Sequence, residues 1–363
     1  MPYGYTNPFS VCFTSMKLRY QDYDRSISDH GILSSNDEVN VFISFESVLN
    51  NLSTIQDLDN KLLLERQFPI ILESEMINLC AHYKRFFRGN GLNVKVFLYY
   101  TDLTSNDFSE FSINDEYRSF YCNKYLRNPK FQLLGRRLCE RIVPRVSKIL
   151  EFIPDVYFIS AKDMDGSLIP AIIANHFPGR KNFIITTDKF ESQYLLNPKF
   201  CTHFIKKNRY TGTKIISQFG TYISDLMKDE NDTAEESAMY MNPSFYTLLM
   251  SAIGDKMRSI TPLKGIGVKT VTKMLSVGIH DGLITPQTNT IELLKDIFPN
   301  DQKDEVVTNF KCTNISDRMK NITDKQVFDI TSQIVDQFDF NSLIRLNQTE
   351  YTDYPFMLEA LTQ

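Results

Sequence analysis

The chain has 363 residues, enough for one large α/β domain or for a core domain with a smaller helical appendage. Its formal net charge of −4 excludes a uniformly basic coat for nucleic acid, although a local basic face can still bind phosphates. The cysteines form no C-x-x-C pair, so a zinc site of the usual spacing is not expected. The N-terminus lacks the plan of a signal peptide and no apolar run is long enough to span a membrane, so we expect a cytoplasmic protein.

Short apolar runs alternate with helical patterns through the first part of the chain. Strands are predicted at residues 39–44, 94–100, 156–160 and 183–187. Helices are predicted over about 45–64, 73–88, 136–151 and 165–176. This alternation predicts an α/β core over residues 39–228, with a mainly parallel sheet flanked by helices. Residues 1–38, which are polar and without periodicity, are expected to form an N-terminal extension.

The most specific motif is a glycine-containing turn between two apolar helices, over residues 260–275. Gly265 permits positive φ, and Gly267 lets the backbone approach a phosphate closely. Ile266 would anchor the turn, and the N–H groups that start the next helix would face the phosphate with the positive end of the dipole behind them. The alternative is an ordinary turn joining two helices. We predict a helix–hairpin–helix over 244–275 that contacts DNA through Lys264, Gly265, Ile266, Gly267, Val268, Lys269, Thr270 and Lys273.

Acidic residues follow the third and fourth predicted strands. Asp163 and Asp165 come after the third, and Asp188 comes after the fourth. Carboxylates at the carboxyl ends of parallel strands converge in the crevice where α/β enzymes bind ligands. Hydrolysis of a phosphodiester by metal ions needs such a cluster to hold Mg²⁺ or Mn²⁺. The alternative for each aspartate is a helix cap.

These motifs together resemble the 5′-nuclease (flap-endonuclease-like) superfamily, whose helix–three-turn–helix signature reads G-D-x-S-D-N-I-P-G-V-x-G-I-G-x-K-T. The residues that match at identical spacing are Gly254, Asp255, Ile260, Gly265, Ile266, Gly267, Lys269 and Thr270. The stretches from Asp163 and from Asp188 are similar to the family's E-A-D-D-x-I-A and T-G-D-K-D-x-x-Q. The resemblance covers about residues 39–275 and implies a PIN-like 5′-nuclease core that acts on duplex DNA with a single-stranded 5′ end. It also implies Mg²⁺ or Mn²⁺ on Asp163, Asp165 and Asp188, and a K⁺ ion at the hairpin.

Several carboxylates of the family are missing from this chain. The residues found in their place are Ser44, Tyr99, Tyr100, Phe190 and Arg258. Acidic residues close enough in sequence to act as substitutes are Glu46, Asp102 and Glu191. An arginine beside the site would repel a metal ion by about 4 kcal/mol per unit charge at ~4 Å. We expect Arg258 either to bind a DNA phosphate in the ion's place or to turn to solvent, and at most one ion to be held.

Residues 103–135 resemble the family's arch, through which a single-stranded 5′ end passes. Arg118 and Lys124 are the candidates for contact with the scissile phosphate, because basic residues interleaved with aromatics suit a single strand. The alternative is a solvated helix whose aromatics face the core. A second basic patch at residues 206–210 is either a DNA contact or a plain solvated loop.

Three functions remain open from the sequence. The first is a DNA-binding protein acting on flap, nicked or forked DNA in replication or repair, with hydrolysis lost or reduced. The second is an active Mg²⁺-dependent 5′→3′ exonuclease, flap endonuclease or RNase H-like primer remover, and the third is a scaffold or assembly subunit. The helical region 276–363 completes the core or docks a replication protein. Drift from the cellular members suggests a phage or viral source, and thus the host cytoplasm.

Overall fold

The computed structural model describes residues 37–48, 61–101, 142–196, 200–223, 243–277 and 298–335, apart from short gaps inside these ranges. The predictions for the arch at 103–135 and for most of the N-terminal extension at 1–38 lie outside the described residues.

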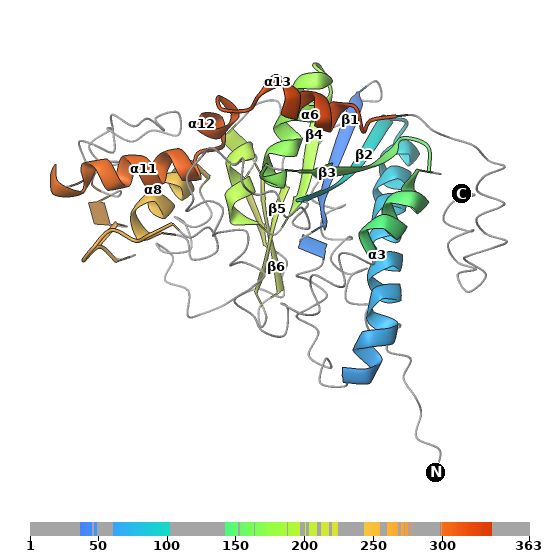
Figure 1. Cartoon of the computed structure of the whole chain (residues 1–363), viewed down its shortest axis with the longest axis horizontal. Coiled ribbons are helices and arrows are strands. Elements are labelled where there is room, and N and C mark those ends of the chain that lie inside the picture. The colour runs from blue at the N-terminus through green and yellow to red at the C-terminus, as the bar shows by residue number, and fades with distance from the viewer. Residues whose placement is uncertain are drawn as a thin grey trace, which may run out of the picture.

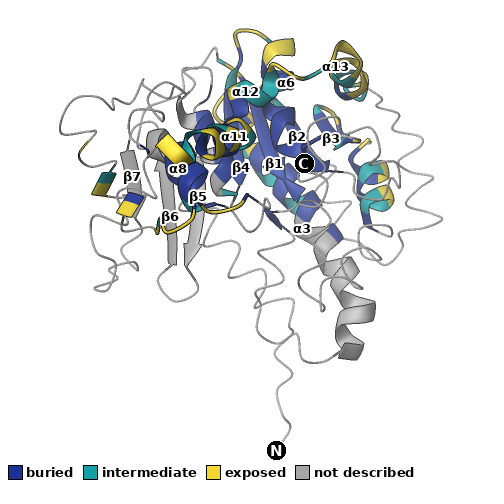
Figure 2. Ribbon diagram, turned by 60° about the vertical axis from the view of Figure 1, so that its left-hand side comes forward, coloured by how far each residue is buried: buried dark blue, intermediate teal, exposed yellow. Residues whose placement is uncertain are grey.

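A seven-stranded sheet in the order β3-β2-β1-β4-β5-β6-β7 forms the centre of the described part (Figure 1). The parallel strands that were predicted are β1 (Glu38–Ser44), β2 (Asn93–Thr101), β3 (Val156–Ala161) and β4 (Lys181–Thr186). The predicted α/β class, with a mainly parallel sheet flanked by helices, is confirmed. Burial explains the order, because β1 lies between β2 and β4 and its residues from Val39 to Ser44 are buried (Figure 2).

Three further strands extend the sheet beyond β4 and were not predicted. They are β5 (His203–Asn208), β6 (Gly212–Ser217) and β7 (Gly220–Ile223). β5 runs parallel to β4, whereas β6 and β7 follow as antiparallel neighbours. The expected loop at residues 206–210 is therefore wrong as far as Asn208, because Lys206 and Lys207 lie within β5. Their charges interrupt the apolar pattern by which a strand is recognised, and β5 is stabilised instead by pairing with β6.

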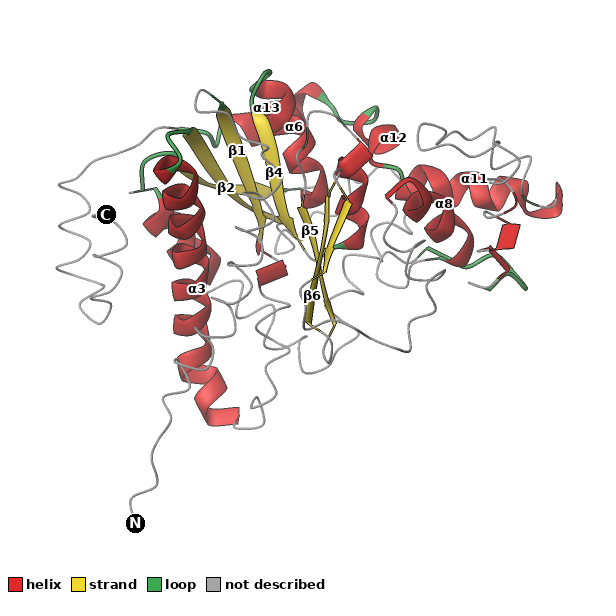
Figure 3. Ribbon diagram, turned by 180° about the vertical axis from the view of Figure 1, so that it is seen from behind, coloured by secondary structure: helices red, strands yellow, loops and turns green. Residues whose placement is uncertain are grey.

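Helices cover both faces of the sheet. Helix α3 (Lys61–Gly89) and a helix over residues 142–150 lie on one face, and α6 (Ile169–His176) lies on the other (Figures 1 and 3). Adjacent residues of β4 show the alternation, since Phe183 contacts Phe87 of α3 and Ile184 belongs to the cluster that contains α6. The prediction of two helices ending near residue 64 and beginning at 73 is wrong, because α3 continues through both.

The C-terminal helices pack against the core and against each other. They are α8 (Pro243–Ile253), α11 (Lys303–Thr313), α12 (Ile315–Met319) and α13 (Asp324–Thr331). Helices α8 and α11 share a separate apolar cluster that contains Leu248, Val306 and Phe310. Ile330 of α13 joins the core cluster on the α6 face of the sheet. None of the helices in the described part combines the length and apolar character needed to cross a membrane.

We predict that Phe97→Ala lowers the free energy of unfolding by about 3–5 kcal/mol, as measured by urea denaturation. The Phe97 ring is fully buried and stacks between Phe42 at 5.3 Å and Tyr157 at 5.2 Å, so its removal leaves a cavity in the sheet core. Phe328→Ala is the matched control, because that ring is 67% exposed and its loss should change stability by about 0.5 kcal/mol or less. Equal effects of the two substitutions would contradict this packing.

Candidate carboxylate cluster and nucleic-acid interface

The carboxyl ends of the parallel strands bring the candidate residues together. Ser44 of β1 pairs in register with Tyr99 of β2, and β3 and β4 lead into Asp165 and Asp188. Asp165 is buried, with 2% of its surface exposed, and Asp188 is half-buried. The edge of the sheet therefore holds acidic groups away from bulk water.

Asp165 acts both as a helix cap and as a charged member of the carboxylate cluster. One carboxylate oxygen, Oδ1, accepts the N–H of Ser167 at 3.0 Å and caps the short helix η2 (Gly166–Leu168). The other, Oδ2, forms an ion pair with Arg318. The backbone approaches closely here, because a Cβ on Gly166 would lie 2.4 Å from Thr101 Oγ1.

Arg318 reaches the cluster from α12, far along the chain from Asp165. Its side chain is 10% exposed, and its guanidinium lies 5.4 Å from the centre of the Phe190 ring, within cation–π range. From the sequence we predicted an arginine near the site but identified it as Arg258, which lies outside the described residues. Nothing near Arg318 in the sequence marks it, because its partner is 153 residues away.

Glu191 is the third acidic side chain that the structure places in the cluster. It is buried in η3 (Lys189–Leu196) and both of its oxygens lie 2.8 Å from the hydroxyl of Tyr99, which donates to the carboxyl group. Burial raises the pKa of Glu191 to about 8, and the negative charge of Asp188 adds to the rise. Hydrogen bonds from Thr186 and Tyr99 oppose it.

Gln193 connects the cluster to the C-terminal helices. Its side-chain amide donates to the carbonyls of Phe190 at 3.0 Å and Thr313 at 2.7 Å, and its oxygen accepts the N–H of Ile315 at 3.2 Å. The next residue back, Asn314, caps α12 through its own side chain. Gln193 thus fixes the start of the helix that carries the arginine.

The described residues of this cluster do not fit a divalent metal ion. In the part of the chain that the structure covers, no three His, Cys, Asp or Glu side chains are grouped to hold one. Asp165 is engaged by a protein cation and Glu191 by a phenol. Other members of the expected set, Asp163 and the possible substitutes Glu46 and Asp102, lie outside the described residues.

The predicted hairpin is exposed, and Thr270 and Val271 after it are helical. Gly265 adopts φ of +74°, and both Gly265 and Gly267 are exposed. The carbonyl of Gly267 accepts the N–H of Val271 at 3.1 Å, which makes Gly267 the N-cap of the following helix. Ile266 is partly buried and packs on the cluster of α8 and α11. The glycine turn that precedes this helix is therefore exposed at the surface.

Two side-chain amides, one from Asn309 of α11 and one from Gln302 just before that helix, hold the hairpin segment in place. Asn309 donates to the carbonyls of Ser251 and Thr261, both at 2.9 Å, and Gln302 donates to the carbonyl of Lys264 at 2.9 Å. These supporting residues were not found from the sequence, because an amide in a helical pattern carries no local signal of a distant loop.

The remaining predicted contacts divide into exposed residues and residues that the structure does not describe. Lys264, Thr270 and Lys273 are exposed beside the hairpin. Predictions for Arg118, Lys124, Arg258, Val268 and Lys269 lie outside the described residues.

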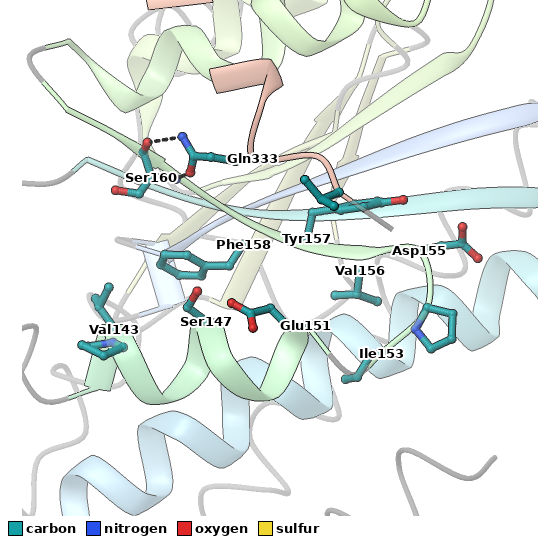
Figure 4. A pocket seen from close by; sticks show the side chains of 13 residues that line it. Val143, Ser147, Glu151, Ile153, Asp155, Val156, Tyr157, Phe158, Ser160 and Gln333 are labelled. Atoms are coloured by element: carbon teal, nitrogen blue, oxygen red, sulfur yellow. Dashed lines mark hydrogen bonds between the residues drawn. The ribbon is translucent and has the colours of Figure 1, made fainter. Parts of the chain in front are cut away.

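A cavity of about 490 Å³ lies elsewhere, along the outer edge of β3 (Figure 4). The carboxamide of Gln333 pairs with both backbone groups of Ser160, at 2.8 and 2.9 Å, as a neighbouring strand would. Among the described residues that line this cavity, none belongs to the cluster around Asp165.

Comparisons with known proteins give similarity to nucleases at low identity. The sequence matches no protein-family model and no curated protein. The 5′-exonuclease of bacteriophage T5 with zinc bound has 14% identity and a TM-score of 0.47, over 82% of this chain and 98% of that one. The T5 flap endonuclease in a pseudo-enzyme–product complex with DNA and metal ions has 13% identity and a TM-score of 0.45, over 90% and 100%. Human GEN1 in complex with Holliday junction DNA has 9% identity and a TM-score of 0.42, over 89% and 70%.

We predict that Gly254→Ala destabilises the protein by about 2 kcal/mol or more in urea denaturation. Gly254 ends α8 at φ of +71°, and a Cβ there would lie 2.4 Å from the carbonyl oxygen of Ile260. Gly89→Ala is the control, since nothing lies within 4 Å of its added Cβ. A Gly254→Ala variant as stable as Gly89→Ala would show that the chain leaves α8 differently.

A second prediction concerns pH. The pKa of Glu191 is raised from 4.5 to about 8, so the folded protein keeps a proton that the unfolded chain releases. Stability contributed by the protonated carboxyl is therefore present at low pH and is lost as pH rises towards and through about 8. The free energy of unfolding of wild type should fall relative to that of Glu191→Gln between about pH 5 and about pH 9. The exposed Glu305→Gln is the control, and a constant difference between wild type and Glu191→Gln would contradict the prediction.

Proposed function

We propose that the chain binds duplex DNA through the hairpin at Gly265–Gly267 and acts on flap, nicked or forked DNA, with metal-dependent hydrolysis lost or reduced. The observation that carries this proposal is the exposed glycine turn at the N-terminus of a helix. Amides in that position bind a backbone phosphate without reading bases, because the phosphate accepts their N–H groups at the positive end of the dipole.

The charges beside the hairpin support the same proposal. Lys264 and Lys273 are exposed next to it, and each can neutralise one phosphate. Because the whole chain has a net charge of −4, its attraction to DNA has to come from a local basic surface of this kind. The motif matches extend the proposal to membership of the 5′-nuclease superfamily and to a single-stranded 5′ end on the substrate. Residues 276–363 lie beyond these matches, and we propose that they complete the core or dock a replication protein.

The carboxylate cluster supports the loss of hydrolysis. Catalysis by two metal ions requires carboxylates that are available to both ions. Asp165 instead faces Arg318, and Glu191 faces Tyr99. When bound, a divalent ion would supply charge neutralisation of the phosphate, and Asp165 and Asp188 are the described residues that would have to hold it.

An active nuclease is the second candidate, and one observation favours it. Glu191 is buried in the cluster with Asp165 and Asp188, whereas the sequence alone did not show whether its side chain points inward. Hydrolysis through this set would require Arg318 to leave Asp165.

The hairpin proposal predicts that Gly267→Asp weakens binding to a 5′-flap duplex at least about tenfold without lowering the unfolding temperature. An aspartate at the N-cap satisfies the helix amides itself and repels the phosphate, yet it is a favoured cap. Nothing lies within 4 Å of a Cβ added to Gly267, so the variant should fold. Binding is measured by fluorescence anisotropy in EDTA over a salt series.

Thr323→Asp is the matched control, because it adds the same charge at the N-cap of α13. Equal DNA affinity of the two variants would show that the hairpin does not contact the DNA. Incubation of a 5′-labelled flap with Mg²⁺ or Mn²⁺ decides the second candidate, since cleavage that Asp165→Asn abolishes would establish an active nuclease. No binding even at low salt would instead favour a scaffold.

A further inference from the structure

The interior of the carboxylate cluster contains a cation that the protein itself supplies. Asp165 is 2% exposed, and a carboxylate so far from water requires a positive partner to remain charged. Arg318 provides that partner through an ion pair to Oδ2, while Ser167 occupies Oδ1. Both oxygens are therefore engaged by groups of the protein.

The surroundings of Arg318 fit a guanidinium held in this position. The fully buried ring of Phe190 lies 5.4 Å from it, which favours a planar cation. The side chain is 10% exposed, so the pair is shielded from salt. These contacts hold the charge against the cluster rather than in solvent.

The helix that carries Arg318 is itself positioned by the cluster. Gln193 binds the N–H of Ile315 and the carbonyl of Thr313, and Asn314 caps α12. The distance from the helix start to the arginine is less than one turn, so the backbone of α12 has little freedom to withdraw it. Gln193 belongs to the same short helix, η3, as Phe190 and Glu191. One element thus places the ring, the acid and the arginine together.

We propose that Arg318 occupies the position of a divalent metal ion at Asp165, so that the cluster binds no such ion until the guanidinium is removed. This inference rests on the proposed loss of metal-dependent hydrolysis and names its cause. A divalent ion at the same carboxylate would have to displace a fixed positive charge that repels it. Removal of that charge takes Arg318 from Oδ2 of Asp165, in a cluster where the charges of Asp165 and Asp188 both act on Glu191.

The test measures the binding of Mn²⁺ to the full chain by electron paramagnetic resonance and the unfolding temperature in EDTA and in Mn²⁺. Wild type is expected to show no response to Mn²⁺. Arg318→Met is expected to unfold at a lower temperature in EDTA and to gain bound Mn²⁺, with a recovery of about 5 °C at saturation. Asp165→Asn added to Arg318→Met should abolish that gain.

Lys320→Met is the matched control, because it removes the same charge from the C-terminal end of α12 at a side chain that is 74% exposed. It should behave as wild type does. If Arg318→Met does not fold in EDTA, it is refolded with Mn²⁺, and recovery of folded protein supports the proposal.

Two results would overturn the inference, and they separate it from the proposed function. A folded Arg318→Met that binds no Mn²⁺, or one that Mn²⁺ does not refold, removes Arg318 from the metal position and leaves the proposed function standing. Binding of Mn²⁺ to wild type that Asp165→Asn abolishes contradicts both this inference and the proposed loss of hydrolysis. DNA binding through the hairpin is measured in EDTA and is independent of either result.

Discussion

The burial of the Asp165 carboxylate is the constraint on which the arrangement of this protein depends. A parallel sheet directs the ends of its strands to one edge, and acidic residues there lie close together and out of water. Mutual repulsion and desolvation then require a cation. In this chain Arg318 supplies it from α12, which ties the C-terminal helices to the acidic edge of the sheet.

The same connection reaches the hairpin. Helix α11 supports the hairpin through Asn309 at one position and ends at Thr313, whose hydroxyl lies 3.1 Å from that of Ser251 in α8. Gln193 then joins this end of α11 to the cluster. The glycine turn and the acidic cluster are therefore parts of one packed unit. We infer that this unit still binds DNA in the absence of a metal ion.

The sequence predicted the elements that depend on patterns of neighbouring residues. Strands β1 to β4 were found because apolar runs are buried on both faces, and Gly265 was placed in the hairpin because positive φ favours glycine. The strand β5 was missed because Lys206 and Lys207 interrupt its pattern, and its stability comes from pairing. Pairs distant in sequence were beyond reach, as with Arg318 and Asp165, or Tyr99 and Glu191. The direction of the Glu191 side chain could not be predicted from its neighbours in sequence, since Tyr99 of the distant strand β2 sets it.

A crystal structure of the chain with a 5′-flap duplex, grown in Mn²⁺ and measured at an anomalous wavelength, tests the central claim most directly. We expect a backbone phosphate against the amides that follow Gly267, no anomalous peak beside Asp165, and the Arg318 guanidinium still on that carboxylate. An anomalous peak at Asp165 with Arg318 turned away, or DNA bound elsewhere with the hairpin bare, would contradict the account.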